Sequence, residues 1–379
     1  MDKVFKYELF NKMIRDFAVN EVKPLAHEVD EQERFPYETV EKMAKLGLMG
    51  IIVPKEYGGM GGDYKMYIKA VEELSKVCAT TGVILSAHTS LCIAPIMEYG
   101  NEEQKKKYLP KLASGEWLGA FGLTEPNAGT DANNQTTTAV KEGDHWVLNG
   151  SKIFITNASP ANVYFVIAVT GRNPKGVECA AFIVEKGFPG FSVGKKELKM
   201  GIRGSSTCEL IFENCIVPEA NLVGKIGEGV KMALKTLDGG RVGISAQALG
   251  IAEGALEATV AYVKERKQFN KPISAFQNTQ FCLADLYTKI NAASLLVERA
   301  TEAKQNKSPM LGMYAAQAKL FAAETAMEVT TKCVQLHGGY GYTREYPVER
   351  MMRDAKITEI YEGTSEVQRM VISGALLKK

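Results

Sequence analysis

Apolar residues recur at helical spacing in the first third of the chain. Phe5, Leu9, Met13 and Phe17 are each four positions apart, which places them on one face of an α-helix. Pro24 then predicts a break or kink, because proline lacks the N–H that a helix interior needs. Further helices are predicted at 67–77, at 83–97 and, limited by Pro110, at 101–109.

The pattern changes to strand-like runs after Trp117. Short segments rich in β-branched and aromatic residues are separated by turn signals such as Asn149-Gly150, and the block ends near Pro218. The predicted strands are 136–140, 145–148, 153–156, 163–169, 180–184 and 208–212. Short strands at such close spacing predict an antiparallel sandwich or barrel.

Helical periodicity returns at Gly227 and continues to the C-terminus. A last helix is predicted to begin at Ser365, where Gln368 would complete a capping box. The other predicted helices are 246–263, 274–305 and 310–336. The order predicts an α+β protein with an N-terminal helical domain at 1–120, a central antiparallel β-barrel or sandwich at 121–226 and a C-terminal helical domain at 227–379.

Composition narrows the functional classes. The net charge is +2 over 379 residues, with basic and acidic residues interspersed, so neither nucleic acid nor a membrane surface is expected as a partner. Seven cysteines without a CxxC pair and four scattered histidines argue against disulfides and a metal site, and most cysteines are expected to be apolar fillers. The first residues lack the apolar core of a signal peptide, and no apolar run approaches the length of a membrane span. We therefore expect a cytoplasmic protein, and a mature organelle protein would show the same features.

Four segments could carry chemistry. The loop 122–131 is rich in backbone donors and hydroxyls, which suits a heteroaromatic ring or a phosphate but also an ordinary turn. The glycines of 335–342 could cap a helix or let the backbone approach a cofactor. Arg266 could clamp a pyrophosphate or be a solvated basic residue. Glu362 follows the apolar Ile360-Tyr361 pair; desolvation would raise its pKa toward that of a general base, although most Glu-Gly turns are solvated.

The order and spacing of these segments resemble the acyl-CoA dehydrogenases over essentially the whole chain. A second family signature, at 122–125 and 129–131, departs only at its last position, where Asn134 replaces the usual small residue. The turn 361–364 is a third landmark, and within the family the chain is most similar to the bacterial short-chain, butyryl-CoA type. The other family signature combines a glutamine and glycines with acidic and basic residues at fixed spacing. It is met at every position, by Gln335, Gly338, Gly339, Gly341, Tyr342, Glu345, Arg350 and Asp354.

The resemblance implies a C-terminal four-helix bundle, FAD between this bundle and the β domain, and a homotetramer. Phe154 stands where the family often has Trp, so the hydrogen bond of an indole N–H is lost. The segment 335–339 is implied to reach the FAD of a neighbouring subunit. The residues implied to bind FAD are Phe121, Leu123, Thr124, Gly129, Thr130, Phe154, Ile155, Thr156, Arg266, Gln277, Gln335, Gly338, Gly339, Thr364 and Glu366. Those implied to contact the substrate are Thr130, Asp238, Gly239, Gly240, Arg241 and Gly363.

The resemblance makes Glu362 the catalytic base. Branches of the family that carry the base just before the arginine matching Arg241 are disfavoured, because Gly240 stands there. The implied reaction is FAD-dependent α,β-dehydrogenation of a short-chain acyl-CoA, such as butyryl-CoA to crotonyl-CoA. The α-proton is removed, the β-hydrogen leaves as hydride to flavin N5, and an electron-transferring flavoprotein accepts the electrons.

Three other functions stay open. An enoyl-CoA reductase of the same family would run the reaction in the opposite direction within an electron-bifurcating complex. An acyl-CoA oxidase is a second possibility, although those chains are usually longer. A non-enzymatic binding module is the third. Neither the direction nor the acyl-chain length follows from the sequence.

Overall fold

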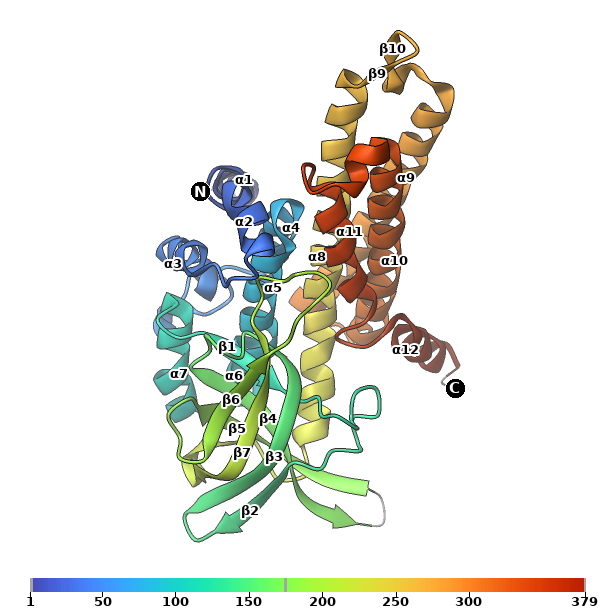
Figure 1. The fold of residues 1–379 in the computed structure, drawn as a ribbon. Coiled ribbons are helices and arrows are strands. Elements are labelled where there is room, and N and C mark those ends of the chain that lie inside the picture. The colour runs from blue at the N-terminus through green and yellow to red at the C-terminus, as the bar shows by residue number, and fades with distance from the viewer. Residues whose placement is uncertain (1–2, 174–175, 378–379) are drawn as a thin grey trace.

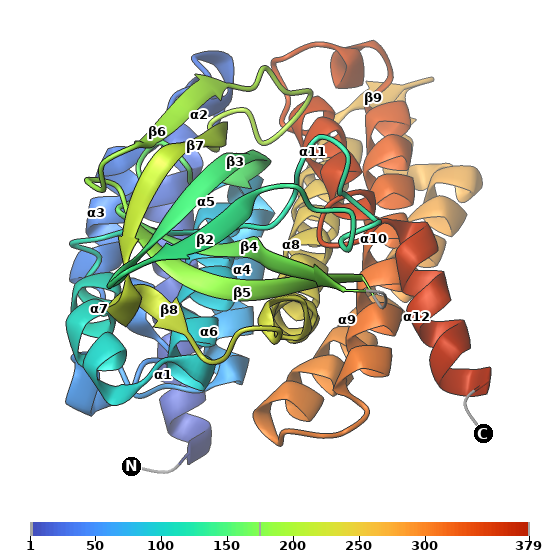
Figure 2. The ribbon, with the colours of Figure 1, turned by 90° about the horizontal axis from the view of Figure 1, so that it is seen from below.

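The computed structural model describes residues 3–173 and 176–377. Each of the three expected domains includes two positions that lie outside the described residues: 1–2, 174–175 and 378–379. Helices, a sheet and then long helices follow one another along the chain, as Figure 1 shows. This order confirms the α+β class with helical N-terminal and C-terminal parts. In Figure 2 the N-terminal helices lie to the left of the sheet and behind it, and most of the C-terminal helices stand to its right.

The N-terminal part consists of short α-helices, several of which are joined by 3₁₀ or π-helical turns. The predicted break near Pro24 is present: a π-helical turn, Ala18–Val22, and a 3₁₀ turn, Lys23–Leu25, separate α1 from α2. The expectation that Pro110 ends a helix is wrong: α7 continues to Ser114, because Leu109 and Leu112 are buried on either side of the proline and hold this turn in place. The helices are α1 Lys3–Phe17, α2 Ala26–Glu31, α3 Tyr37–Lys45, α4 Tyr64–Val77, α5 Ala79–Ser86, α6 Ala94–Tyr99 and α7 Glu102–Ser114.

The segment from α5 to α6 corrects one expectation. Ala79–Tyr99, with the π-helical stretch Ala87–Ile93 in its middle, is 21 residues long and apolar enough to cross a membrane by length and composition. However, 94% of its apolar window is buried inside the protein. It is therefore the core helix of the N-terminal part. Its apolar residues, which would suit a membrane span, pack here against other helices of the protein.

The central sheet is open and mixed. Its strands follow the order β6-β7-β3-β2-β4-β5-β8, and β1 lies parallel to β4. Of the expected antiparallel barrel or sandwich, the closed barrel is wrong, because the path ends at β6 and β8 without closing. The pairing is also not wholly antiparallel, since β4 pairs in parallel with both β1 and β2. A parallel pair forms because β1 and β4 are not consecutive, so no hairpin fixes their direction. The strands are β1 Gly119–Gly122, β2 Thr138–Glu142, β3 His145–Thr156, β4 Val163–Asn173, β5 Gly176–Glu185, β6 Phe191–Lys196, β7 Thr207–Pro218 and β8 Leu222–Val223.

Two apolar cores lie on opposite faces of this sheet. Along β4, Phe165 and Ile167 belong to the main core shared with the helices, whereas Tyr164 and Val166 belong to a second core. That second core also contains Phe212 of β7, so the sheet curls around its own apolar side chains. The two strands predicted at 145–148 and 153–156 are one strand, β3, because the Asn149-Gly150 signal marks a register shift and not a turn.

The C-terminal part is built on three long helices and two shorter ones. The 37-residue α8 packs against α4 and α5 of the N-terminal part as well as against α10. The short α11 packs on both α8 and α10, and α12 packs on α10. The helices are α8 Gly229–Glu265, α9 Gln277–Gln305, α10 Leu311–His337, α11 Val348–Lys356 and α12 Ser365–Leu377, and a small hairpin, β9 Lys267–Gln268 with β10 Lys271–Pro272, joins α8 to α9. All seven cysteines are free, and all but Cys282 are buried, as expected of apolar fillers.

Candidate active site

Glu362 lies in a left-handed turn between α11 and α12. Glu362 has φ of 52° and Gly363 has φ of 93°, a pair of conformations that glycine adopts without strain and glutamate rarely adopts. The predicted capping box is wrong: Thr364, not Ser365, accepts a bond from the Val367 N–H at 3.3 Å. Gln368 instead donates backwards from Nε2, to the carbonyl oxygens of Gly363 at 2.7 Å and Glu362 at 3.3 Å.

The Glu362 carboxyl group is packed against α8. A Cβ placed on Gly240 would lie 2.0 Å from Oε2 of Glu362 and 2.9 Å from Cδ2 of Leu91, so the glycine leaves the space that the carboxyl group fills. Oε2 is buried and has no hydrogen-bond partner among the described residues. Burial raises the pKa of Glu362 to about 8, against the opposing effect of Lys319 and Arg241. The group can therefore exchange a proton near neutral pH.

Charged side chains of α8 and α10 surround the turn. Arg241 donates from Nη1 to Oδ1 of Asp238 at 2.7 Å, and its Nε lies 3.5 Å from the carbonyl oxygen of Glu362. Lys319 is fully buried, and its Nζ donates to the carbonyl oxygen of Gly363 at 2.7 Å. Asp238 and Arg241, expected to contact the substrate, thus lie in one turn of α8 beside Glu362 and Gly363.

The two flavin segments expected in the β domain adjoin each other. The N–H of Ile153, on β3, donates to the carbonyl oxygen of Thr124 at 2.8 Å, so the loop after β1 lies along β3. Phe154 has φ of 58° at a register shift of β3 and is 61% exposed, which leaves its ring free for a planar partner. Among the other expected residues, Phe121, Leu123 and Ile155 are buried, Thr124 and Thr156 are half-buried, and Gly129 and Thr130 are exposed.

This loop also approaches the Glu362 turn in space. Both views show the segment between β1 and β2 leaving the sheet and extending toward α12, at whose start the Glu362 turn lies (Figures 1 and 2). Thr364 is half-buried at that start, and Glu366, in the first turn of α12, is exposed.

A buried ion pair secures the loop, and sequence reasoning did not select it. Nζ of Lys152 donates to Oε1 of Glu125 at 2.7 Å, to Oε1 of Gln135 at 2.9 Å and to the Leu123 carbonyl oxygen at 3.1 Å. Burial would raise the pKa of Glu125, but Lys152 and hydrogen bonds, one of them from the Thr136 N–H, lower it to about 2. The available signal was a lysine within a strand that otherwise alternates toward a core.

The remaining expected FAD residues lie at the other end of the bundle. Arg266 directly follows α8, and its guanidinium lies 5.6 Å from the centroid of the Tyr340 ring. The neighbouring β9–β10 hairpin is remote from the sheet (Figure 1). From Gly240 to Arg266 the chain advances along α8 by about 40 Å, at ~1.5 Å per residue. The exposed residues of this end group are Arg266, Gln277, Gln335, Gly338 and Gly339.

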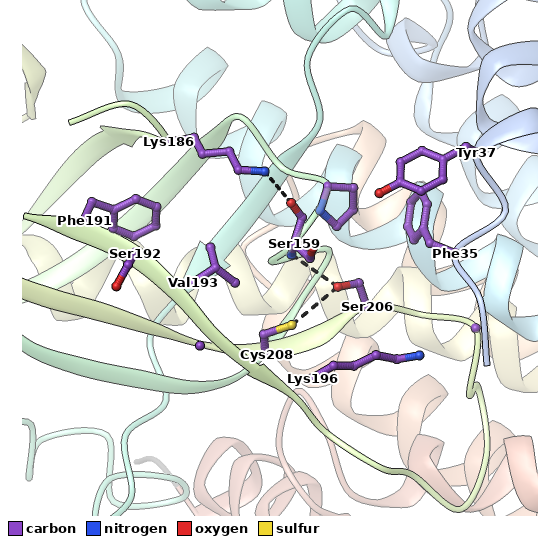
Figure 3. Close-up of a pocket in the computed structure, with 13 residues that line it drawn as sticks. Phe35, Tyr37, Ser159, Lys186, Phe191, Ser192, Val193, Lys196, Ser206 and Cys208 are labelled. Atoms are coloured by element: carbon purple, nitrogen blue, oxygen red, sulfur yellow. Dashed lines mark hydrogen bonds between the residues drawn. The ribbon is translucent and has the colours of Figure 1, made fainter. Parts of the chain in front are cut away.

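A separate hollow of about 690 Å³ lies between the start of α3 and the strands β6 and β7 (Figure 3). Phe35 and Tyr37 line one side, and Phe191 lines the other. Nζ of Lys186 donates to the carbonyl oxygen of Ser159 at its rim, at 2.7 Å. None of the residues expected to bind FAD or substrate lines this hollow.

Comparison with known proteins now identifies the class. Sequence models of the acyl-CoA dehydrogenase N-terminal, middle and C-terminal domains match residues 6–116, 120–215 and 227–377. A short-chain-specific acyl-CoA dehydrogenase of Clostridium acetobutylicum is 62% identical over 371 residues, which cover 98% of either chain. The chain belongs to the acyl-CoA dehydrogenase family.

Solved structures agree in fold over the whole chain. Butyryl-CoA dehydrogenase of Megasphaera elsdenii has 51% identity and a TM-score of 0.95, and the alignment covers 98% of both chains. A chain from a study of the electron-transferring flavoprotein of Acidaminococcus fermentans and flavin-based electron bifurcation has 55% identity and a TM-score of 0.95, again covering 98% of both chains. An acyl-CoA dehydrogenase of Bacillus anthracis solved with FAD has 37% identity and a TM-score of 0.93, covering 98% of this chain and 66% of that one.

Proposed function

We propose that this protein oxidises short-chain acyl-CoA thioesters with FAD as cofactor and Glu362 as the base that removes the α-proton. One observation carries the proposal: a carboxyl group whose buried Oε2 has no partner among the described residues, held on a strained turn where its pKa is about 8. A structural carboxylate would instead be paired or solvated, because an unpaired buried charge is costly. The short-chain-specific relative supports the substrate class.

The residues of the β domain suit FAD. The exposed face of Phe154 can pack on a flat ring, and Thr124 and Thr156 place hydroxyl groups on the two adjoining segments. When FAD is bound, its flavin ring supplies the acceptor for the β-hydrogen of the substrate. The protein's own task is to place the substrate so that the α-hydrogen faces Glu362.

Glu362 must be ionised to remove the proton. The carboxylate then takes the α-proton, and the thioester oxygen gains negative charge. No hydrogen bond among the described residues uses the N–H of Glu362, so this group is free to donate to that oxygen as the charge develops. Arg241 is buried and paired with Asp238 in the same turn of α8, and we propose that this turn lies beside the CoA part of the substrate.

The separation of the two groups of FAD residues favours an assembly. The ~40 Å between Gly240, beside the Glu362 turn, and Arg266 favours a cofactor that is shared between two chains. We propose that Arg266, Gln277 and the 335–339 segment reach the FAD of a second copy, within a homotetramer. We also place the protein in the cytoplasm.

We propose an electron-transferring flavoprotein as the electron acceptor, because a relative at 55% identity was solved in a study of such a protein. That study concerns electron bifurcation, which favours a second candidate: reduction of an enoyl-CoA in the opposite direction. The same site serves both, since a base that removes the α-proton also returns it.

The test is anaerobic mixing of the FAD-loaded protein with acyl-CoAs of increasing chain length. We expect loss of flavin absorbance, fastest with butyryl-CoA or a neighbour of similar length. If no acyl-CoA reduces the flavin, and the reduced protein is not reoxidised by crotonyl-CoA, the proposal is wrong.

A further inference from the structure

Lys319 is a charged residue in an apolar position. It lies in α10 among the buried residues Ala315, Ala316, Ala318 and Ala322, and it is itself fully buried. Its ammonium group forms no ion pair within 4.0 Å among the described residues, and its partner is the carbonyl oxygen of Gly363 at 2.7 Å. Burial lowers the pKa of Lys319 to about 8, while the Glu362 carboxylate acts in the opposite direction. Burying an ammonium group is costly, so a role at the turn would explain why it stays.

The Gly363 carbonyl is held from two helices. Lys319 Nζ reaches it from α10 and Gln368 Nε2 from α12, each at 2.7 Å. The turn needs such support, because the left-handed conformation of Glu362 is strained. Since the Gly363 carbonyl directly follows Glu362, fixing it also fixes the direction of the Glu362 side chain.

Other charged or titratable groups around Glu362 do not replace Lys319. On α8, Arg241 already pairs with Asp238 at 2.7 Å. On α4, Tyr67 is buried and its pKa is raised to about 12, by burial and then by Glu362. Of the two cations that act on Glu362 in the described part of the chain, Lys319 is thus the one without a carboxylate partner of its own. The titratable neighbours on the turn's own segment are Glu359, Tyr361 and Glu366.

We propose that Lys319 is a positioning residue for the base: it holds the turn of Glu362 and Gly363 through the Gly363 carbonyl, and its ammonium group favours the ionised form of the Glu362 carboxyl group in an apolar site. The inference rests on the proposed function, because it presumes that Glu362 is the base. It adds a requirement that the turn alone does not show, namely a buried cation on α10.

The decisive variant is Lys319→Met, assayed by anaerobic flavin reduction across pH. Without the cation the pKa of Glu362 rises, so the acidic limb of the rate profile should move up by about one pH unit. The rate falls most at low pH and recovers toward high pH, while KM changes little because Asp238 and Arg241 are untouched. Infrared difference spectra against Glu362→Gln should show the carboxyl group of Glu362 titrating at the same higher pH.

Gln368→Met is the matched control. It removes the other donor to the Gly363 carbonyl without changing charge, so it should slow reduction evenly across pH and leave the limb in place. If Lys319→Met fails to bind FAD or to fold, Lys319→Gln keeps a polar group and tests the same shift. An unmoved limb and unmoved infrared titration in the lysine variants would overturn the inference. Glu362→Gln separates the two ideas: if it retains activity the proposed function fails, and if it is inactive while the limb stays unmoved only the role of Lys319 fails.

Discussion

At the scale of single residues, the site depends on the contact between Glu362 and Gly240. The sequence allowed the prediction of Glu362 as base, from its turn and the family resemblance. It did not reveal Lys319, Gln368 or the direct contact with Gly240, because these come from α10, α12 and α8 and meet only in the folded chain. A lysine within an alanine-rich helix was the one visible sign.

Gly240→Ala should displace the carboxyl group of Glu362. Its new Cβ would overlap Oε2, and Leu91 blocks a simple shift of the helix. We expect the rate of flavin reduction to fall by about 100-fold, as for a misplaced catalytic group, with little change in FAD content. Gly374→Ala is the control, since nothing lies within 4 Å of its Cβ. An unchanged rate in Gly240→Ala would mean that this contact does not position the base.

At the scale of elements, long periodic helices were predicted well, whereas several short strands, the short helix α11 and the end of α7 were not. The helix 310–336 matches α10 closely, because its apolar spacing is sustained over many turns. The strands β1, β6 and β8 and the helix α11 were missed, and α7 was cut short at Pro110. In these elements tertiary packing decided the structure against a weak or misleading local pattern.

Lys152→Met should loosen the loop that follows β1. It leaves Glu125 buried beside an apolar side chain, and breaking a buried pair costs about 3–5 kcal/mol. We expect a lower midpoint in urea unfolding and weaker FAD binding. Lys45→Met, which breaks an exposed pair with Glu41, should cost less than about 1 kcal/mol. Equal effects of the two variants would show that the buried pair does not secure the loop.

At the scale of the whole molecule, the family resemblance supplied what the pattern could not. Alternation and turn signals led to an antiparallel barrel or sandwich, whereas the sheet does not close and is partly parallel, since pairing of distant strands leaves no local trace. The limits 1–120, 121–226 and 227–379 for the domains stay a prediction. The expected FAD residues fall into two groups, one at the sheet and the Glu362 turn and one past the C-terminal end of α8, and we propose that two chains together bind one cofactor.

Shared sites predict complementation between inactive variants. Arg266→Ala removes a proposed FAD contact at the far end of α8, and Glu362→Gln removes the base. A mixed assembly refolded from both chains contains some sites with Glu362 from one copy and Arg266 from the other. We expect part of the wild-type rate of flavin reduction to return on mixing, as measured in stopped flow. No recovery, although mixed assemblies form, would contradict a site built from two copies.

The central claim is that Glu362 removes the α-proton, and one measurement tests it most directly. Glu362→Gln keeps the shape of the side chain but cannot act as a base. The FAD-loaded variant is mixed anaerobically with butyryl-CoA. The control is Glu328→Gln, which changes an exposed glutamate of α10 that pairs with Lys289. We predict flavin reduction about 1,000-fold slower than in the wild type and the control, the magnitude typical of a lost general base. Reduction at the wild-type rate would contradict the account.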